Sequence, residues 1–163
     1  MKNVFWKSVP AGIAGAAMLA VGVMPGAAQD GVTAYQVEAA FEDVRFDLEN
    51  AIVNRGLVID YVSHIGTMLA RTGEDVGSDK KLYANAQSML FCSANLSRKA
   101  MEADPANIAY CPYAVFVYET AEKPGSVTVG YRHLNETGSD ASKAAIADVN
   151  ALLDEIARDA SGQ

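Results

Sequence analysis

The sequence has no cluster of basic residues, and this shortage limits the partners the protein can have. Its 163 residues include 13 Lys and Arg against 20 Asp and Glu, and Lys80-Lys81 is the densest basic spot. Binding to a phosphate backbone or to an anionic membrane surface depends on clustered cations. The sequence therefore predicts neither a nucleic-acid-binding protein nor one that binds a membrane surface.

The sequence also lacks the short motifs of the common catalytic sites. It contains no Gly-x-Ser-x-Gly nucleophile motif, no glycine-rich phosphate loop and no His-Glu-x-x-His zinc motif. No pair of carboxylates stands at a spacing diagnostic of acid–base chemistry. We therefore expect a binding role more than an enzyme, and the sequence indicates no particular cofactor.

The first 28 residues resemble a cleavable secretory signal. Lys2 and Lys7 precede an apolar stretch over residues 9–23, and small residues follow up to Ala28. The stretch is shorter than the roughly 20 residues that span a bilayer, so we favour cleavage after Ala28 over an uncleaved membrane anchor. We expect a periplasmic or secreted protein with no membrane insertion after cleavage. The loss of two lysines would change the formal net charge from −7 to −9.

Cysteine is scarce, with only Cys92 and Cys111 in the chain. Neither belongs to a Cys-x-x-Cys motif, so a thioredoxin-like redox site is not indicated. In an exported protein an even count favours a structural disulfide. One alternative is a metal-binding or thiol redox site in which both thiolates act with His64, since sulfur and imidazole ligands suit copper or zinc. Another is a pair of unbridged, buried thiols.

Two long amphipathic helices are predicted, one near each end of the domain. In the first, apolar residues recur at three- and four-residue spacing, at Phe41, Val44, Leu48, Ala51 and Ile52. Gly56 follows, and glycine commonly ends a helix in the left-handed conformation. The second helix is expected over residues 139–157, with a frayed tail over residues 160–163.

Short apolar or alternating runs predict strands between these helices. The expected strands cover residues 33–38, 57–62, 88–92, 113–120 and 126–132. Pro124-Gly125 between the last two indicates a hairpin. Short helices are expected at residues 64–70, 80–86 and 95–103. This order predicts a single α+β domain over residues 29–160, with a mainly antiparallel sheet and helices packed on one face.

The order and spacing of several segments resemble a known family. They are the helix from Phe41 to Gly56-Leu57 with His64 after it, Phe91-Cys92-Ser93-Ala94-Asn95, Cys111 to Glu119, and Val127 to Tyr131. Together they resemble domain of unknown function 302 over roughly Val37 to Arg132. The resemblance implies a fold similar to the TATA-binding-protein-like group, a homodimer, and no known activity. The cysteine pair departs from the commonest family version and looks like a trait of an exported subgroup.

Three residues are candidates for a ligand-binding site, namely His64, Tyr113 and Glu119. His64 directly follows a predicted strand, which would hold it in place, and the resembled family tends to show histidine there. Tyr113 is one of several tyrosines suited to line a groove. His133 stands in a polar run and is expected to face water. We expect an exported accessory protein that binds a small ligand or a protein partner near His64 and the two cysteines.

Overall fold

The computed structural model describes residues 30–163, so the expected signal segment lies outside the described residues. Its elements are β1 (Val32–Glu38), α1 (Phe41–Val53), β2 (Val58–Ser63), α2 (Ile65–Thr72), the 3-10 helix η1 (Glu74–Val76), β3 (Tyr83–Cys92), α3 (Ala94–Ala103), the 3-10 helix η2 (Pro105–Tyr110), β4 (Tyr113–Thr120), β5 (Ser126–Arg132) and α4 (Asp140–Ser161). Within this part of the chain, no helix is both long enough and apolar enough to span a membrane.

The five strands form one sheet in the order β1-β5-β4-β3-β2. Every neighbouring pair is antiparallel, which confirms the predicted α+β class with an antiparallel sheet. The predicted β4–β5 hairpin is also confirmed, and Gly125 in its loop has a φ of +88° that favours glycine. Because β1 pairs with β5, the first and the last of these strands are neighbours in the sheet.

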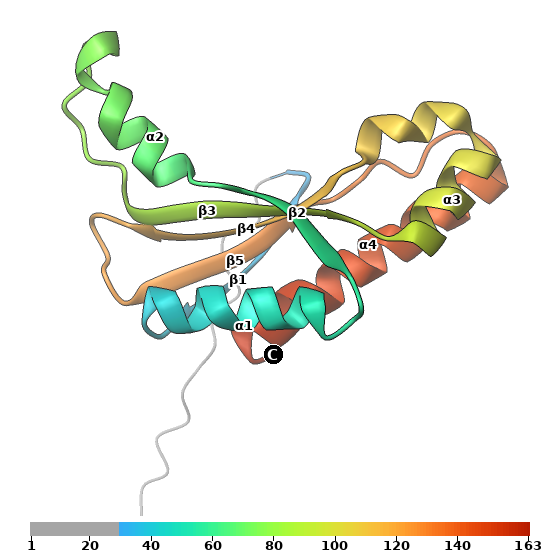
Figure 1. The fold of residues 1–163 in the computed structure, drawn as a ribbon, viewed down its shortest axis with the longest axis horizontal. Helices are drawn as coiled ribbons and strands as arrows, with labels where there is room; N and C mark the ends of the chain where they lie inside the picture. Colours follow the sequence, from blue (N-terminus) through green and yellow to red (C-terminus); the bar gives the residue numbers. More distant parts are fainter. Residues whose placement is uncertain (1–29) are drawn as a thin grey trace, which may run out of the picture.

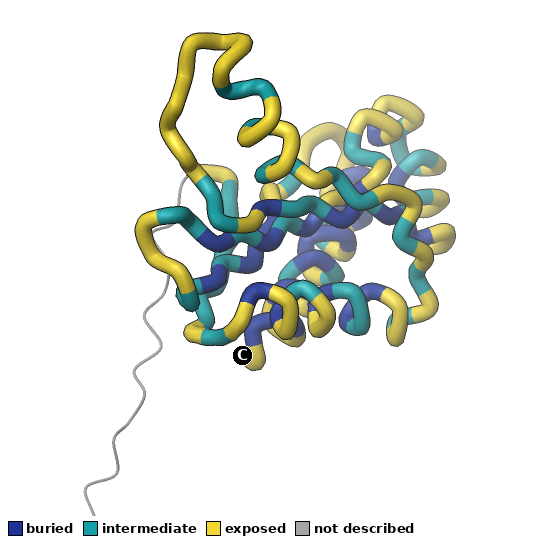
Figure 2. Tube along the Cα trace, turned by 60° about the vertical axis from the view of Figure 1, so that its left-hand side comes forward, coloured by how far each residue is buried: buried dark blue, intermediate teal, exposed yellow. Residues whose placement is uncertain are grey.

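Helices α1 and α4 cover one face of the sheet, here called the inner face (Figure 1). The core lies between these layers and includes Leu48 and Ile52 of α1 and Val149 and Ile156 of α4. All five apolar residues predicted for the first helix are buried. Figure 2 shows the buried segments gathered between the sheet and these two helices.

The opposite face of the sheet, here called the outer face, is not covered by the long helices. Helix α2 lies against it near the start of β3, where a Cβ on Gly66 would come within 2.9 Å of the Ala86 nitrogen. The arm formed by residues 65–82 then projects away from the body, and it is largely exposed (Figures 1 and 2). The expectation of helices on one face therefore holds for α1 and α4 but not for α2.

The edge strand β1 is fixed to α4 by a polar cluster. The Tyr35 hydroxyl donates a hydrogen bond to Asp154, whose carboxylate also accepts from Tyr131 (3.3 Å) and from Arg158 (2.6 Å). The Arg158 guanidinium lies 4.9 Å from the centre of the Tyr35 ring. Burial and the hydrogen bond to Asp154 raise the pKa of Tyr35 to about 12. The cluster thus holds the first strand through hydrogen bonds that require a protonated tyrosine.

Two local predictions were wrong. Residues 80–86 were expected to form a helix, but β3 begins at Tyr83, and a bulge between Tyr83 and Asn85 breaks the alternation that would mark a strand. Residues 160–163 were expected to fray, but α4 continues to Ser161 and buries Ala160. The Ser161 hydroxyl donates to the Ala157 carbonyl at 2.9 Å, so tertiary packing overrides the polar sequence of the tail.

Candidate functional site

A groove of about 770 Å³ lies on the outer face of the sheet. Its floor comes from alternate residues of the central strands, because successive side chains of a strand point to opposite faces. Val115 of β4 enters the core, whereas Ala114, Phe116 and Tyr118 line the groove. The same alternation that builds the core on one side therefore builds the groove on the other.

Aromatic rings form the floor of the groove. Phe116 and Tyr118 stack with 5.9 Å between ring centres, and Tyr83 of β3 meets Tyr118 edge-on at 5.5 Å. All three line the groove and are only partly buried. The exposed ring faces provide an apolar surface suited to contact with an aromatic or aliphatic group.

Gly130 of β5 makes room for this floor. It is the cross-strand partner of Phe116, and a Cβ at this position would lie 2.6 Å from the Phe116 Cζ and 2.5 Å from the Thr33 carbonyl oxygen. Both distances are far below van der Waals contact. Glycine at position 130 thus permits the Phe116 ring to lie close to the sheet.

Polar groups gather where β5 ends. Arg132 and His133 line this end of the groove, as does Tyr110, whose hydroxyl donates to the Asn135 carbonyl at 3.1 Å. Asn150 of α4 fixes the backbone here, since its amide bonds both the nitrogen (2.8 Å) and the carbonyl oxygen (2.9 Å) of Leu134. The polar end of the groove is therefore built on anchored backbone.

The structure separates the three predicted ligand residues. His64 is exposed at the start of α2 and is not among the residues that line the groove. Tyr113 does line the groove, although it is 3% exposed and its hydroxyl lies 3.1 Å from the Ser97 hydroxyl. Burial raises the pKa of the Tyr113 phenol, and the hydrogen bond to Ser97 acts in the opposite direction.

Glu119 is 8% exposed and both of its carboxylate oxygens have partners within the fold. One oxygen accepts a hydrogen bond from the Asn85 amide at 3.1 Å, and the other accepts from the Gly125 backbone nitrogen in the hairpin loop. The geometry thus gives Glu119 a structural part in closing the β4–β5 hairpin.

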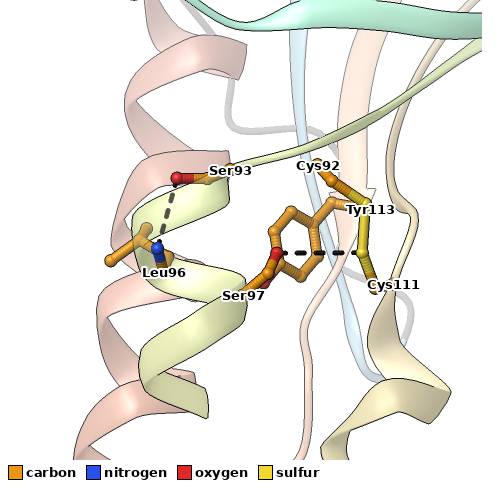
Figure 3. The surroundings of a disulfide bond; sticks show 6 residues. All are labelled: Cys92, Ser93, Leu96, Ser97, Cys111 and Tyr113. Carbon is orange, nitrogen blue, oxygen red and sulfur yellow. Dashed lines mark hydrogen bonds between the residues drawn. A yellow bond between two sulfur atoms is a disulfide. The ribbon is translucent and has the colours of Figure 1, made fainter. Parts of the chain in front are cut away.

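Cys92 and Cys111 form the disulfide expected from the sequence, with their sulfur atoms at bonding distance, 2.14 Å. The bond links the last residue of β3 to Cys111, which directly follows η2, and so encloses α3 and η2. Figure 3 shows Ser97 of α3 beside it, with its hydroxyl 3.7 Å from the Cys111 sulfur. Ser93 caps α3 next to the bond by accepting from the Leu96 nitrogen.

The structure does not form the alternative site of two cysteines and His64. Strand β2 runs antiparallel to β3, with Val58 opposite Cys92 and Ser63 opposite Ser88, so His64 follows the end of β2 that lies away from the disulfide. Among residues 30–163, no group of three or more His, Cys, Asp or Glu side chains is placed to hold a metal ion.

Phe116 and Arg132 were not predicted as site residues, and His133 was expected to face water. His133 is exposed, yet it belongs to the lining of the groove. The signal that would have found the floor is the alternation of Ala114, Phe116 and Tyr118 with buried residues along one strand. Its meaning depends on which face of the sheet lacks helices, and only the tertiary structure gives that information.

Fold and site together define a small α+β protein whose single antiparallel sheet carries two long helices on one face and an open groove on the other. The sequence of residues 33–160 matches the family described as Domain of unknown function DUF302, and the chain belongs to this family. The recognition made from the sequence is thereby confirmed at the level of the family.

A solved structure described as "Crystal structure of uncharacterized conserved protein DUF302 from Bacillus stearothermophilus" has the same fold. It matches with a TM-score of 0.66 and 13% sequence identity over 80% of this chain and 98% of the other. No curated protein matches the chain. At this identity the structural likeness establishes the fold and leaves the ligand to be argued from this chain's own residues.

Proposed function

We propose that the protein is an exported accessory protein that binds a small organic ligand in the groove on the outer face of its sheet. The observation that carries the proposal is the groove itself, about 770 Å³ with an aromatic floor and polar groups at one end. Ligand sites are commonly concave, mostly apolar and provided with a few polar groups that fix orientation.

Two features support export. The N-terminal segment has the basic, apolar and small-residue parts of a secretory signal. The two cysteines form an intramolecular disulfide, and such bonds persist in oxidising compartments such as the periplasm. We infer a periplasmic or secreted location from these two features together.

Fluorescence of Nile red, a neutral apolar dye, tests the binding proposal. The protein is purified in the form that remains after any N-terminal processing by the cells that produce it. We expect saturable enhancement for the wild type and strong loss for Phe116→Ala, which removes part of the aromatic floor. Tyr61→Ala is the matched control because Tyr61 is an aromatic residue of the same sheet, 62% exposed, that does not line the groove. Equal dye binding by all three proteins would overturn the assignment of the groove.

The two histidines distinguish the groove from the site expected at first. We expect His133→Ala to weaken the binding of a ligand that reaches the polar end, and His64→Ala to leave it unchanged, because only His133 lines the groove. If only His64→Ala loses binding, the ligand site lies at the start of α2 and not in the groove.

A protein partner is the second candidate, and the arm of residues 65–82 supports it. No residue of α2 is buried, and Met68, Val76 and Leu82 are 43%, 75% and 46% exposed. A second copy of the chain covering these residues would give the homodimer that the family resemblance implies. Analytical ultracentrifugation of the wild type and of Met68→Ser measures the oligomeric state. If both proteins are monomers, the arm is not a dimer interface and the groove remains the candidate binding surface.

A further inference from the structure

The groove avoids negative charge although the protein is strongly acidic. The chain has 20 Asp and Glu, all of them after residue 29, yet none lines the groove. The charged or titratable side chains of the lining, apart from its tyrosines, are Arg132 and His133. A neutral ligand would not require this distribution, whereas an anionic one would be repelled by carboxylates in the lining.

Arg132 is also free to accept an anionic partner. Arg45, Arg55, Arg98 and Arg158 each form an ion pair with Asp or Glu. Within residues 30–163, Arg132 has no such pair, and its side chain is exposed at the polar end of the groove. A guanidinium binds a carboxylate through two parallel hydrogen bonds.

His133 adds a hydrogen-bond donor next to Arg132. Its Nε2 lies 3.3 Å from the Asn150 amide nitrogen, which also donates to the Leu134 carbonyl at 2.9 Å and to Glu136 at 3.2 Å. A neutral imidazole carries one N–H in either tautomer. Glu136 approaches the same Nε2 at 3.8 Å but is not part of the lining. Since Asn150 is itself 5% exposed and bonded to Leu134, the imidazole is held in place before any ligand arrives.

The apolar floor begins beside these polar groups. Arg132 stands two residues beyond Gly130 on β5, and Tyr118 stands two residues beyond Phe116 on the antiparallel β4. Arg132 and Tyr118 therefore lie on opposite sides of the Phe116–Gly130 pair, four residue steps or about 13 Å apart. A ligand that spans this distance would have a charged group at one end. The rest of it would be an apolar body made of one ring and a short chain.

We propose that the groove binds small amphipathic carboxylates, with the carboxylate on Arg132 and His133 and the apolar body on Phe116 and Tyr118. This inference rests on the proposed function, because it names the ligand class of the same groove. It predicts selection for charge, which a merely apolar groove would not show.

Isothermal titration calorimetry with 4-phenylbutyrate and the neutral 4-phenylbutyramide, which match in size, tests the inference. We expect the wild type to bind the acid at least tenfold more tightly than the amide. Arg132→Gln should lose about tenfold in affinity for the acid and little for the amide, because a charge-assisted hydrogen bond contributes more than a neutral one. Arg71→Gln is the control, since Arg71 is exposed on α2 outside the groove.

The outcomes separate the two proposals. Equal affinity of the wild type for acid and amide overturns the carboxylate assignment and leaves the binding groove standing. An equal loss for both ligands in Arg132→Gln also overturns it, because Arg132 would then act through the shape of the groove. Absence of binding for both ligands while Nile red still binds rejects the ligand class alone. Absence of binding for all three probes rejects the groove as a small-ligand site.

Discussion

The Phe116 ring lies against Gly130, its cross-strand partner on the outer face of the sheet. A Cβ at position 130 would stand 2.6 Å from the Phe116 Cζ, 2.9 Å from the Ala34 Cβ and 2.5 Å from the Thr33 carbonyl oxygen. The ring can rotate away, but the Thr33 backbone belongs to the β1–β5 pairing and cannot move independently. Stability and groove shape therefore both depend on this one residue.

Gly130→Ala is expected to destabilise the protein by about 1–3 kcal/mol, the usual cost of forcing extra atoms into packed structure. Urea denaturation followed by far-UV circular dichroism measures the change. Thr128→Ala, at an outer-face position of the same strand, is the control and should change the free energy of unfolding far less. If Gly130→Ala unfolds at the wild-type midpoint, the contact between Phe116 and Gly130 is not a packing constraint.

Removal of the disulfide with Cys92→Ser and Cys111→Ser together is expected to reduce stability by about 3 kcal/mol. The cysteines are 19 residues apart, and a loop of this length loses roughly that much chain entropy in the unfolded state when it is closed. Differential scanning calorimetry should show a melting temperature lower by roughly 10 °C. A reductant should lower the wild-type value similarly and leave the double variant unchanged; an unchanged wild type after verified reduction contradicts the prediction.

Tyr35 makes stability depend on alkaline pH. Its pKa is raised in the folded protein to about 12, mainly by burial and then by the hydrogen bond to Asp154. A raised folded pKa gives stability that is fully present below the unfolded value of 10 and is lost as the pH rises toward 12. The wild type should therefore lose stability between about pH 10 and 12 more steeply than Tyr35→Phe. Urea denaturation at a series of pH values measures this. If the free energy of unfolding falls equally with pH in both proteins, Tyr35 is not the cause of the alkaline loss of stability.

Asp154 acts in the opposite direction at acidic pH. Burial opposes its ionisation, but hydrogen bonds from Arg158, Tyr35 and Tyr131 outweigh this and hold the pKa of the carboxyl below its usual value. A lowered folded pKa gives stability that is present above the unfolded pKa and is lost as the pH falls through the folded one. Asp154→Asn should flatten the acid limb of the stability curve, and an acid limb as steep as that of the wild type would exclude this residue.

Processing of the N-terminus has a simple optical test. The single tryptophan, Trp6, precedes the expected cleavage point after Ala28. Protein purified from the periplasmic fraction should therefore begin at Gln29 and emit only tyrosine fluorescence. Intact-mass measurement provides the independent check, and a mass that includes residues 1–28 would contradict export by cleavage.

The sequence predicted local elements well where one residue pattern governs them. The buried stripe of α1, from Phe41 to Ile52, and the β4–β5 hairpin with Gly125 depend on short-range periodicity and turn chemistry. The start of β3 was missed because its hydrogen bonds come from β2 and β4, and a bulge hides its alternation. Strand β3 therefore depends on its neighbours in the sheet, and its own residues only partly specify it.

The candidate site was harder to predict than the fold, for a related reason. The disulfide could be inferred because two cysteines leave only one pairing within the chain. The groove could not, because Phe116, Arg132 and Ala34 come from three strands whose order in the sheet is not the order of the chain. His64 was chosen by its place after a strand, but that strand lies at the edge of the sheet, and the next residue, Ile65, lines the groove in its stead.

The position of α4 at the end of the chain bears on when the protein can fold. Residues from Ala145 to Ala160 of this helix complete the core, and β1 pairs with β5, about a hundred residues later. A growing or translocating chain thus gains little native structure until its last helix is free, because contacts between distant residues form late. Such a chain remains largely unfolded until synthesis is almost finished, which would suit the export proposed above, because a polypeptide must be unfolded to pass through a narrow membrane channel.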